Sequence, residues 1–81
     1  MKAGKWNYKT KKYDEYTLPE GATTFASDLD AVVNCASCGK QMTYGDGYTS
    51  MEIHTPSSGF GYIVCSDCYD REIAVRREYD A

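Results

Sequence analysis

Two short stretches, Asn34-Cys35-Ala36-Ser37-Cys38-Gly39-Lys40 and Cys65-Ser66-Asp67-Cys68, contain all four cysteines of the 81-residue chain. In each stretch two residues separate the cysteines, so that one tight turn can direct both sulfur atoms at the same ion. Zinc takes four ligands in tetrahedral geometry, and paired cysteines with this spacing commonly supply them. The sequence therefore predicts one zinc site formed by Cys35, Cys38, Cys65 and Cys68.

The surroundings of the two pairs differ. Gly39 follows the first pair and lets the backbone bend, so that amide groups can point at the thiolates. Cys65 is expected to end a strand, and Cys68 to lie in the first turn of a helix that begins near Ser66 and Asp67. The positive end of that helix would then face the second pair of thiolates.

Three other uses of the cysteines stay open beside zinc. Rubredoxin-like iron sites use two similar knuckles that each end in glycine, whereas Tyr69 follows Cys68 here. A redox Cys-x-x-Cys normally opens a helix in a thioredoxin-like βαβ pattern, and two disulfides would need an oxidising compartment. Zinc is favoured. Because four thiolates saturate it, we expect a structural site rather than a catalytic one.

Residues 1–21 are predicted to form a β-hairpin. Trp6, Tyr8 and Thr10 alternate with polar residues, and this period of two is typical of a strand. Residues 13–18 are expected to return beside it after a turn at residues 10–12, and Pro19-Glu20-Gly21 to end the hairpin.

Residues 22–33 are expected to connect this hairpin to the first cysteine pair. Within them Ser27-Asp28-Leu29-Asp30 is predicted to open one short helical turn, with Ser27 as its cap. Residues 41–64 are predicted to form a second hairpin, with a turn at Gly45-Asp46-Gly47 and a loop at residues 55–59. In its first strand, residues 48–54, one face should carry Thr49, Met51 and Ile53.

Residues 69–79 contain neither glycine nor proline and are predicted to be helical. Tyr69, Ile73 and Arg76 or Arg77 are expected on one face of this helix. Glu72 and Arg76 have the spacing of an ion pair on a solvated face.

A knuckle, a hairpin and a helix that carries the last two ligands together resemble the treble-clef zinc-finger superfamily, over residues 33–79. The resemblance implies a small α+β domain, here a single domain over residues 1–81 with the N-terminal hairpin packed on the treble clef. In the HNH nuclease branch of this superfamily a hairpin histidine acts as general base beside a second metal ligand. His54 is the only histidine, so no catalytic residue is expected, and His54 is interpreted as an exposed strand residue.

Two further resemblances bear on function. The stretch from Cys35 to Gly39 resembles the first half of the finger in DksA/TraR-like transcription factors, but the gap between the pairs is longer here. The whole pattern is similar to small uncharacterised phage and prophage proteins, through Trp6-Asn7-Tyr8-x-Thr10, Tyr16-x-Leu18-Pro19, Asn34-Cys35-Ala36-Ser37-Cys38-Gly39 and Gly59-Phe60-Gly61-Tyr62. This second resemblance implies an adaptor between phage and host proteins.

Composition narrows the choice of partner. The net charge is −3, whereas nucleic-acid binding usually needs a basic surface. Lysines interleaved with aromatic residues in residues 2–17, and arginines at 71, 76 and 77, keep nucleic-acid binding as the alternative. No apolar run reaches the roughly 20 residues that span a membrane, and no signal peptide is recognised. We therefore expect a cytoplasmic, non-enzymatic module that binds protein.

Overall fold

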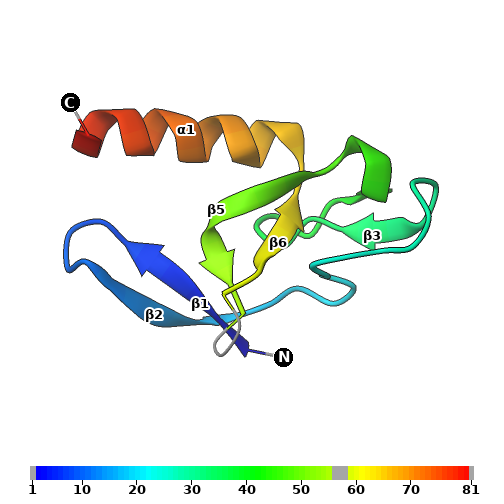
Figure 1. Cartoon of the computed structure of the whole chain (residues 1–81), viewed down its shortest axis with the longest axis horizontal. Helices are drawn as coiled ribbons and strands as arrows, with labels where there is room; N and C mark the ends of the chain where they lie inside the picture. The colour runs from blue at the N-terminus through cyan, green and yellow to red at the C-terminus, as the bar shows by residue number, and fades with distance from the viewer. Residues whose placement is uncertain (1, 56–58, 81) are drawn as a thin grey trace.

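The computed structural model describes residues 2–55 and 59–80 of the chain (Figure 1). Within these residues the chain forms six strands, one 3-10 helix and one α-helix: β1 Lys2–Asn7, β2 Lys12–Thr17, β3 Val32–Asn34, β4 Gln41–Thr43, η1 Tyr44–Asp46, β5 Tyr48–His54, β6 Gly61–Val64 and α1 Ser66–Asp80. The loop predicted at residues 55–59 lies largely outside the described residues. None of the helices in the described residues combines the length and the apolar character that spanning a membrane requires.

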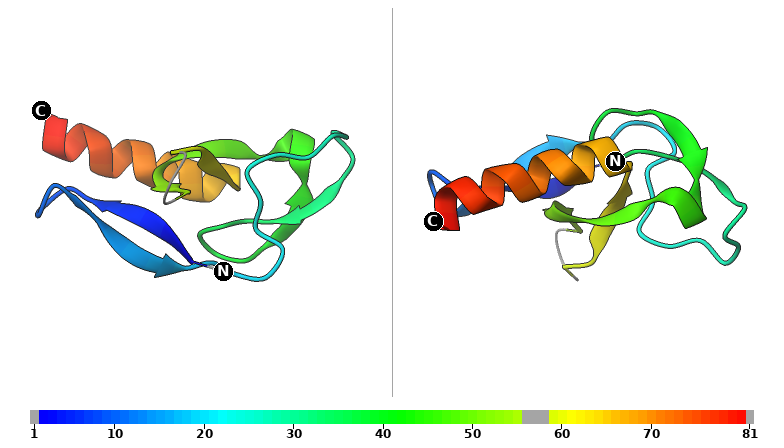
Figure 2. Two further views of the ribbon diagram at one scale, coloured as in Figure 1. Left: turned by 60° about the horizontal axis from the view of Figure 1, so that its bottom comes forward. Right: turned by 90° about the horizontal axis from the view of Figure 1, so that it is seen from above.

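The strands form two antiparallel sheets, and the molecule is a small α+β structure. One sheet has four strands in the order β2-β1-β5-β6, and the other consists of β3 and β4 alone. Helix α1 packs against β5. Its C-terminal part then extends over the β1–β2 hairpin, as both views in Figure 2 show. The hairpin and the β3–β4 sheet therefore lie at opposite ends of the molecule (Figure 1).

The N-terminal hairpin forms as expected, but its turn begins earlier in the chain. Strands β1 and β2 pair from Lys2↔Thr17 to Asn7↔Lys12, so the turn occupies residues 8–11. Asn7 closes it, because its carbonyl oxygen accepts from Lys11 N at 2.7 Å and its side-chain Oδ1 accepts from Lys9 N at 2.9 Å. Such side-chain bonds make asparagine a strong turn former.

The hairpin is an extension of the main sheet rather than a unit packed upon it. Strand β1 pairs with β5 at Gly4↔His54 and Lys5↔Ile53. The ring of Tyr13 lies across Gly4, where a Cβ atom would stand 3.2 Å from Tyr13 Cδ1. Glycine at position 4 thus lets Tyr13 reach His54, with the two rings edge to face at 5.6 Å between centroids.

A β-bulge changes the predicted pattern of strand β5. The β5–β6 register shifts between Thr49 and His54, and Ser50, Glu52 and Ile53 are buried. The expected face of Thr49, Met51 and Ile53 is therefore wrong. Ser50 Oγ stabilises the irregular backbone by accepting from Glu52 N at 3.1 Å and from Ile53 N at 2.9 Å.

The helical turn expected at residues 27–30 is also wrong, since the structure shows a bend and a turn there. Asp28 forms it. Its side-chain Oδ1 accepts from Asp30 N at 3.0 Å, and its carbonyl oxygen accepts from Ala31 N at 3.1 Å. Aspartate bonds of this kind compete with helix formation.

The core is small and surrounds the cysteines. Its buried members are Ala3, Leu18, Cys35, Ala36, Ile53, Tyr62, Val64, Cys65 and Cys68. Three of the four cysteines belong to it, and few large aliphatic side chains do. A core this poor in aliphatic groups commonly needs a metal or another cross-link for stability. The site that holds the cysteines is thus also the centre of the fold.

Candidate metal centre

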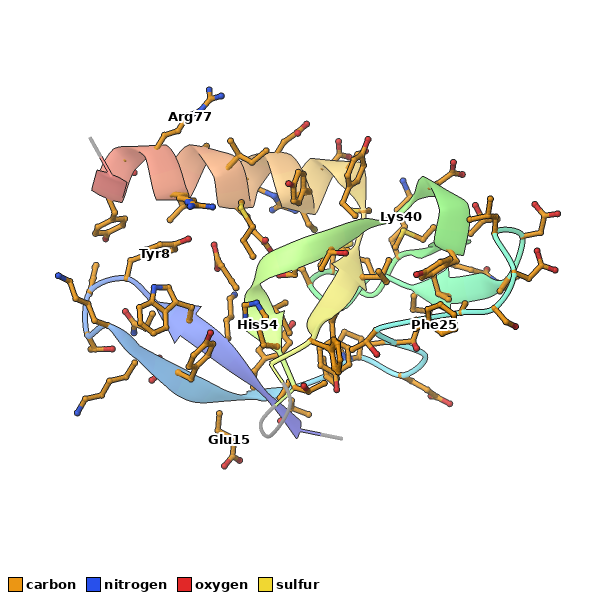
Figure 3. All side chains as sticks on the ribbon, in the orientation of Figure 1. Tyr8, Glu15, Phe25, Lys40, His54 and Arg77 are labelled. Atoms are coloured by element: carbon orange, nitrogen blue, oxygen red, sulfur yellow. The ribbon has the colours of Figure 1, made fainter. Side chains whose placement is uncertain are left out.

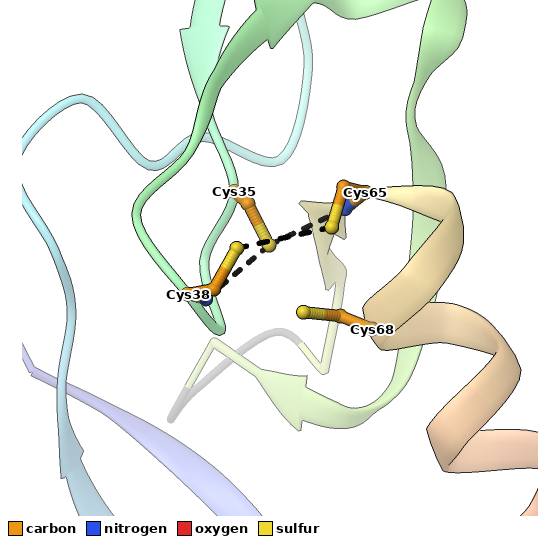
Figure 4. A group of neighbouring side chains, drawn as sticks. All are labelled: Cys35, Cys38, Cys65 and Cys68. Atoms are coloured by element: carbon orange, nitrogen blue, oxygen red, sulfur yellow. Dashed lines mark hydrogen bonds between the residues drawn. The ribbon is translucent and has the colours of Figure 1, made fainter.

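The fold brings all four cysteines together (Figure 4). Their sulfur atoms lie within 4.8 Å of one another, and Cys38 Sγ is 3.8 Å from Cys65 Sγ. Tetrahedral zinc with bonds of about 2.3 Å needs sulfurs about 3.8 Å apart. The donor set therefore fits a metal ion such as zinc. All four cysteines are free.

The first pair sits on a knuckle directly after β3. Cys35 N donates to Lys40 O at 2.8 Å, and Gly39 N donates to Cys35 O at 2.9 Å, which closes the loop. Gly39 has a φ of +81°, a left-handed conformation that costs other residues about 1–2 kcal/mol. The bend expected after Cys38 is therefore present, and glycine is the residue that permits it.

Backbone amides converge on the sulfur of Cys35, which is completely buried. Ser37 N donates to it at 3.3 Å, Cys38 N at 3.4 Å and Cys65 N at 3.3 Å. Burial raises the pKa of Cys35, but these three amides, together with the Cys38 side chain, lower it by more, to about 7. Cys35 is the thiol of the cluster that is best prepared to be a thiolate.

The second pair spans the junction of β6 and α1. Cys65 follows the strand, and its carbonyl oxygen accepts from Tyr69 N at 2.9 Å as the helix begins. Cys68 lies in the first turn of α1, where the sequence predicts it. Burial, and then the neighbouring cysteines, raise its pKa to about 12. A cation in the cluster would offset this cost, because it favours the charged form of the thiol.

Side chains, rather than amides, support this second pair. Arg71 Nη2 donates to Cys68 Sγ at 3.2 Å. Glu72 is buried and its carboxylate joins α1 to β5, since Oε2 accepts from Ser50 Oγ at 2.7 Å and Oε1 accepts from Met51 N at 2.8 Å. The expectation of Glu72 on a solvated helix face is therefore wrong. The buried positions of the helix are Cys68 and Glu72, while Tyr69 and Ile73 are only half-buried and Arg76 is exposed.

These supporting residues were missed by sequence reasoning, although a signal for them exists. Arg71 and Glu72 follow Cys68 by three and four positions, and residues with this spacing share a helix face. Once Cys68 is assigned to the first helical turn, the helix face that carries it must point towards the cysteine cluster and β5.

The knuckle is also tied to the rest of the molecule. Tyr16 of the hairpin donates its hydroxyl to Ala36 O at 2.7 Å, and Ala36 N donates to Ile63 O of β6 at 2.9 Å. Burial, and then the nearby cysteine sulfurs, raise the pKa of Tyr16, which keeps it a donor. The hairpin and β6 therefore hold the knuckle from two sides.

His54 is not among the clustered residues. It lies on β5 where β1 joins, is half-buried, and is not the exposed strand residue that we expected. Its Nδ1 is buried and has no hydrogen-bond partner among the described residues. Within residues 2–55 and 59–80 His54 belongs to no group of three or more potential metal ligands.

Comparisons with protein-family models, with curated proteins and with solved structures find no match to this chain. The treble-clef assignment and the resemblance to phage proteins therefore stay predictions.

Proposed function

We propose that this chain is a treble-clef protein-binding module that has no enzymatic activity and holds one structural zinc ion. The order of its parts supports the fold assignment. The β3–β4 knuckle carries Cys35 and Cys38, the β5–β6 hairpin follows, and α1 begins with the second pair.

The composition of the cluster supports a structural role for the ion. Catalytic zinc keeps one position open for water, whereas four cysteine sulfurs within 4.8 Å of one another can occupy all four positions. Arg71 and the amides at Cys35 would hold the ligands, and the ion would supply a cross-link between the knuckle and α1. Cysteines bind zinc as thiolates and cannot do so when oxidised to disulfides. We therefore place the protein in the cytoplasm, where thiols stay reduced.

One observation carries the protein-binding role: large apolar side chains are exposed on a very small molecule. Phe25, Leu29 and Val32 are 65–68% exposed. Exposed apolar surface of this kind commonly marks an interaction site. An adaptor between phage and host proteins, which the sequence resemblance implies, would have this character.

Affinity capture tests the proposal. The tagged, zinc-loaded protein is exposed to lysate of its native host, with chelator-treated protein and the Cys35→Ala variant as matched controls. We expect a defined protein partner on the zinc-loaded form that is lost on both controls. Capture of the same proteins by all three forms, or of none by the zinc-loaded form, would contradict it.

A second candidate function, nucleic-acid binding, rests on one groove between the hairpin and α1. The groove has a volume of about 440 Å³, and its lining includes Lys5, Lys9, Trp6, Tyr8 and Tyr79 beside the carboxylates of Asp14 and Glu15. Tyr8 points towards α1 (Figure 3), and its ring stacks on Tyr79 at 5.3 Å between centroids. Aromatic rings beside cations are typical of single-strand binding sites.

Fluorescence anisotropy with a labelled oligothymidine separates the two candidates. Nucleic-acid binding predicts an affinity that falls steeply with added salt. A flat titration at micromolar protein in low salt would remove this candidate and leave the protein-binding proposal standing.

A further inference from the structure

The charges of residues 2–46 are divided between the two ends of the molecule. Residues 2–17 contain five lysines and two acidic residues, a net charge of +3. Residues 18–46 contain four acidic residues and one lysine, a net charge of −3. The longest dimension of the molecule is 36 Å, and the two segments lie towards its opposite ends (Figure 1). Each end therefore presents a different surface to a partner.

The acidic end also carries the most exposed apolar groups. We define the connector surface as the apolar side chains Phe25, Leu29, Val32 and Tyr44 with the carboxylates Asp28, Asp30 and Asp46. Phe25 is 68% exposed, Leu29 67% and Val32 65%, and the three carboxylate residues are exposed as well. Alternating apolar and acidic groups thus stand in solvent side by side, as in Asp28-Leu29-Asp30.

Hydrogen bonds hold this surface in place. Gly45 N donates to Leu29 O, and Tyr44 N donates to Ala31 O, both at 2.9 Å. The rings of Phe25 and Tyr44 meet edge to face, with 6.0 Å between centroids. Thr43 Oγ1 donates to Asp46 Oδ2 at 2.9 Å. The connector is thereby fastened to the β4–η1 segment, so a partner would meet a surface that is already ordered, which lowers the entropic cost of binding.

We propose that the connector surface binds a basic, apolar segment of a partner protein. Aliphatic or aromatic side chains of that segment would cover Leu29, Phe25 and Val32, and its Lys or Arg side chains would pair with the carboxylates. The proposal rests on the proposed function and specifies the partner's chemistry. The net charge of −3 over residues 18–46 disfavours nucleic acid and anionic membranes at this end, because like charges repel.

Selection from a random peptide library on the zinc-loaded full chain tests this chemistry. We expect enriched peptides to combine Lys or Arg with Leu, Ile or aromatic residues. Their affinity, measured by fluorescence anisotropy, should fall about tenfold for the Leu29→Ala/Val32→Ala variant, since apolar anchors dominate interface energies. It should fall about threefold for Asp28→Asn/Asp30→Asn, and this loss should shrink in high salt.

Two matched controls lie outside the connector surface. Phe60→Ala removes an equally exposed aromatic ring, and Asp70→Asn removes an exposed carboxylate on α1. Both should leave the affinity of the selected peptides unchanged. Because all the altered side chains are exposed, every variant should keep the cobalt spectrum of the folded metal site.

Three outcomes would overturn the inference. Enriched peptides that are acidic or bind equally well to Leu29→Ala/Val32→Ala would refute it while leaving the protein-binding proposal intact. A library that yields no enriched peptides, together with a host partner whose affinity these substitutions do not change, would also refute the inference and leave the protein-binding proposal intact. Sedimentation that shows self-association abolished by Leu29→Ala would instead assign the surface to a second copy, whose hairpin is basic and aromatic.

Discussion

The two cysteine pairs reach the same centre by different means. The knuckle pair depends on backbone: three amides donate to Cys35 Sγ, and Gly39 adopts the left-handed conformation that closes the loop. The helix pair depends on side chains, because Arg71 donates to Cys68 and Glu72 fastens α1 to β5. A local motif thus builds one half of the site, and tertiary contacts position the other.

The pairs are nevertheless not independent. One of the three amides that donate to Cys35 Sγ belongs to Cys65. The helix pair therefore supplies one of the hydrogen bonds that stabilise the knuckle pair. Removing the metal should therefore affect both halves, whereas changes in the supporting groups should affect one half more than the other.

Loss of the metal is the largest expected effect. Structural zinc contributes on the order of 10 kcal/mol in small fingers, so chelation or Cys35→Ala should abolish cooperative thermal unfolding and much of the helical circular dichroism. Cys38 is exposed, and Cys38→Ala should retain weaker cobalt binding with water in its place. A chelated protein with an unchanged melting transition would refute the structural role.

Removing the carboxylate of Glu72 comes next. Glu72→Ala removes the acceptor for the buried Ser50 hydroxyl proton and for the Met51 amide, and we expect about 2–3 kcal/mol of destabilisation in urea unfolding of the zinc-loaded protein. Glu78→Ala, an exposed position on the same helix, is the matched control. Equal effects of the two substitutions would show that the contact between α1 and β5 does not support the helix pair.

The corresponding change on the knuckle is Gly39→Ala. A Cβ there would meet only Pro19 Cβ, at 3.7 Å, so the cost is conformational and about 1–2 kcal/mol. Gly59 has a similar φ of +73° with nothing within 4 Å of a Cβ. Gly59→Ala should cost comparable stability but leave the cobalt spectrum unchanged, whereas Gly39→Ala should shift it. If the Gly39→Ala and Gly59→Ala variants gave identical cobalt spectra, the conformation of Gly39 would not be what shapes the knuckle half of the metal site.

Arg71→Met should have a smaller effect. It removes the donor to Cys68 Sγ, and because Arg71 is exposed we expect a loss of at most about tenfold in zinc affinity. Arg77 points away from the hairpin (Figure 3), so Arg77→Met is the control. Competition with a chromophoric chelator measures both. An unchanged affinity for Arg71→Met would mean that its hydrogen bond does not stabilise the thiolate.

The smallest predicted effect concerns Glu52, next to the bulge of β5. Burial, and then Glu72, raise its pKa, while Lys5 lowers it in part. The folded state therefore favours the protonated form, and ionisation of Glu52 destabilises the fold as pH rises through the raised pKa. Glu52→Gln should stabilise the zinc-loaded protein by about 0.5 kcal/mol at pH 7. That advantage should decrease towards pH 5, and an advantage that grows on acidification would contradict the assignment.

Much of the fold follows from local patterns. The N-terminal hairpin, the bend at Gly39 and the helix after Cys65 are each specified by turn residues or periodicity within a few positions, and the structure contains all three. The bulge in β5 was not predictable, because it depends on Ser50 finding both local amides and the distant Glu72. A periodicity of two assumes regular pairing and fails where a long-range contact shifts the register.

By itself, the sequence determined which residues form the candidate metal site, since Cys-x-x-Cys spacing and Gly39 act through a single turn of chain. Only the tertiary structure decided what supports that site and which surfaces remain exposed. Strand β1 joins β5 across some 50 residues, and Glu72 meets Ser50 across 22. Contacts so far apart in sequence form only when the whole core makes up for the entropy of closing the chain between them. For that reason the connector surface, with Leu29 and Val32 in solvent, emerges from the fold and not from the motif.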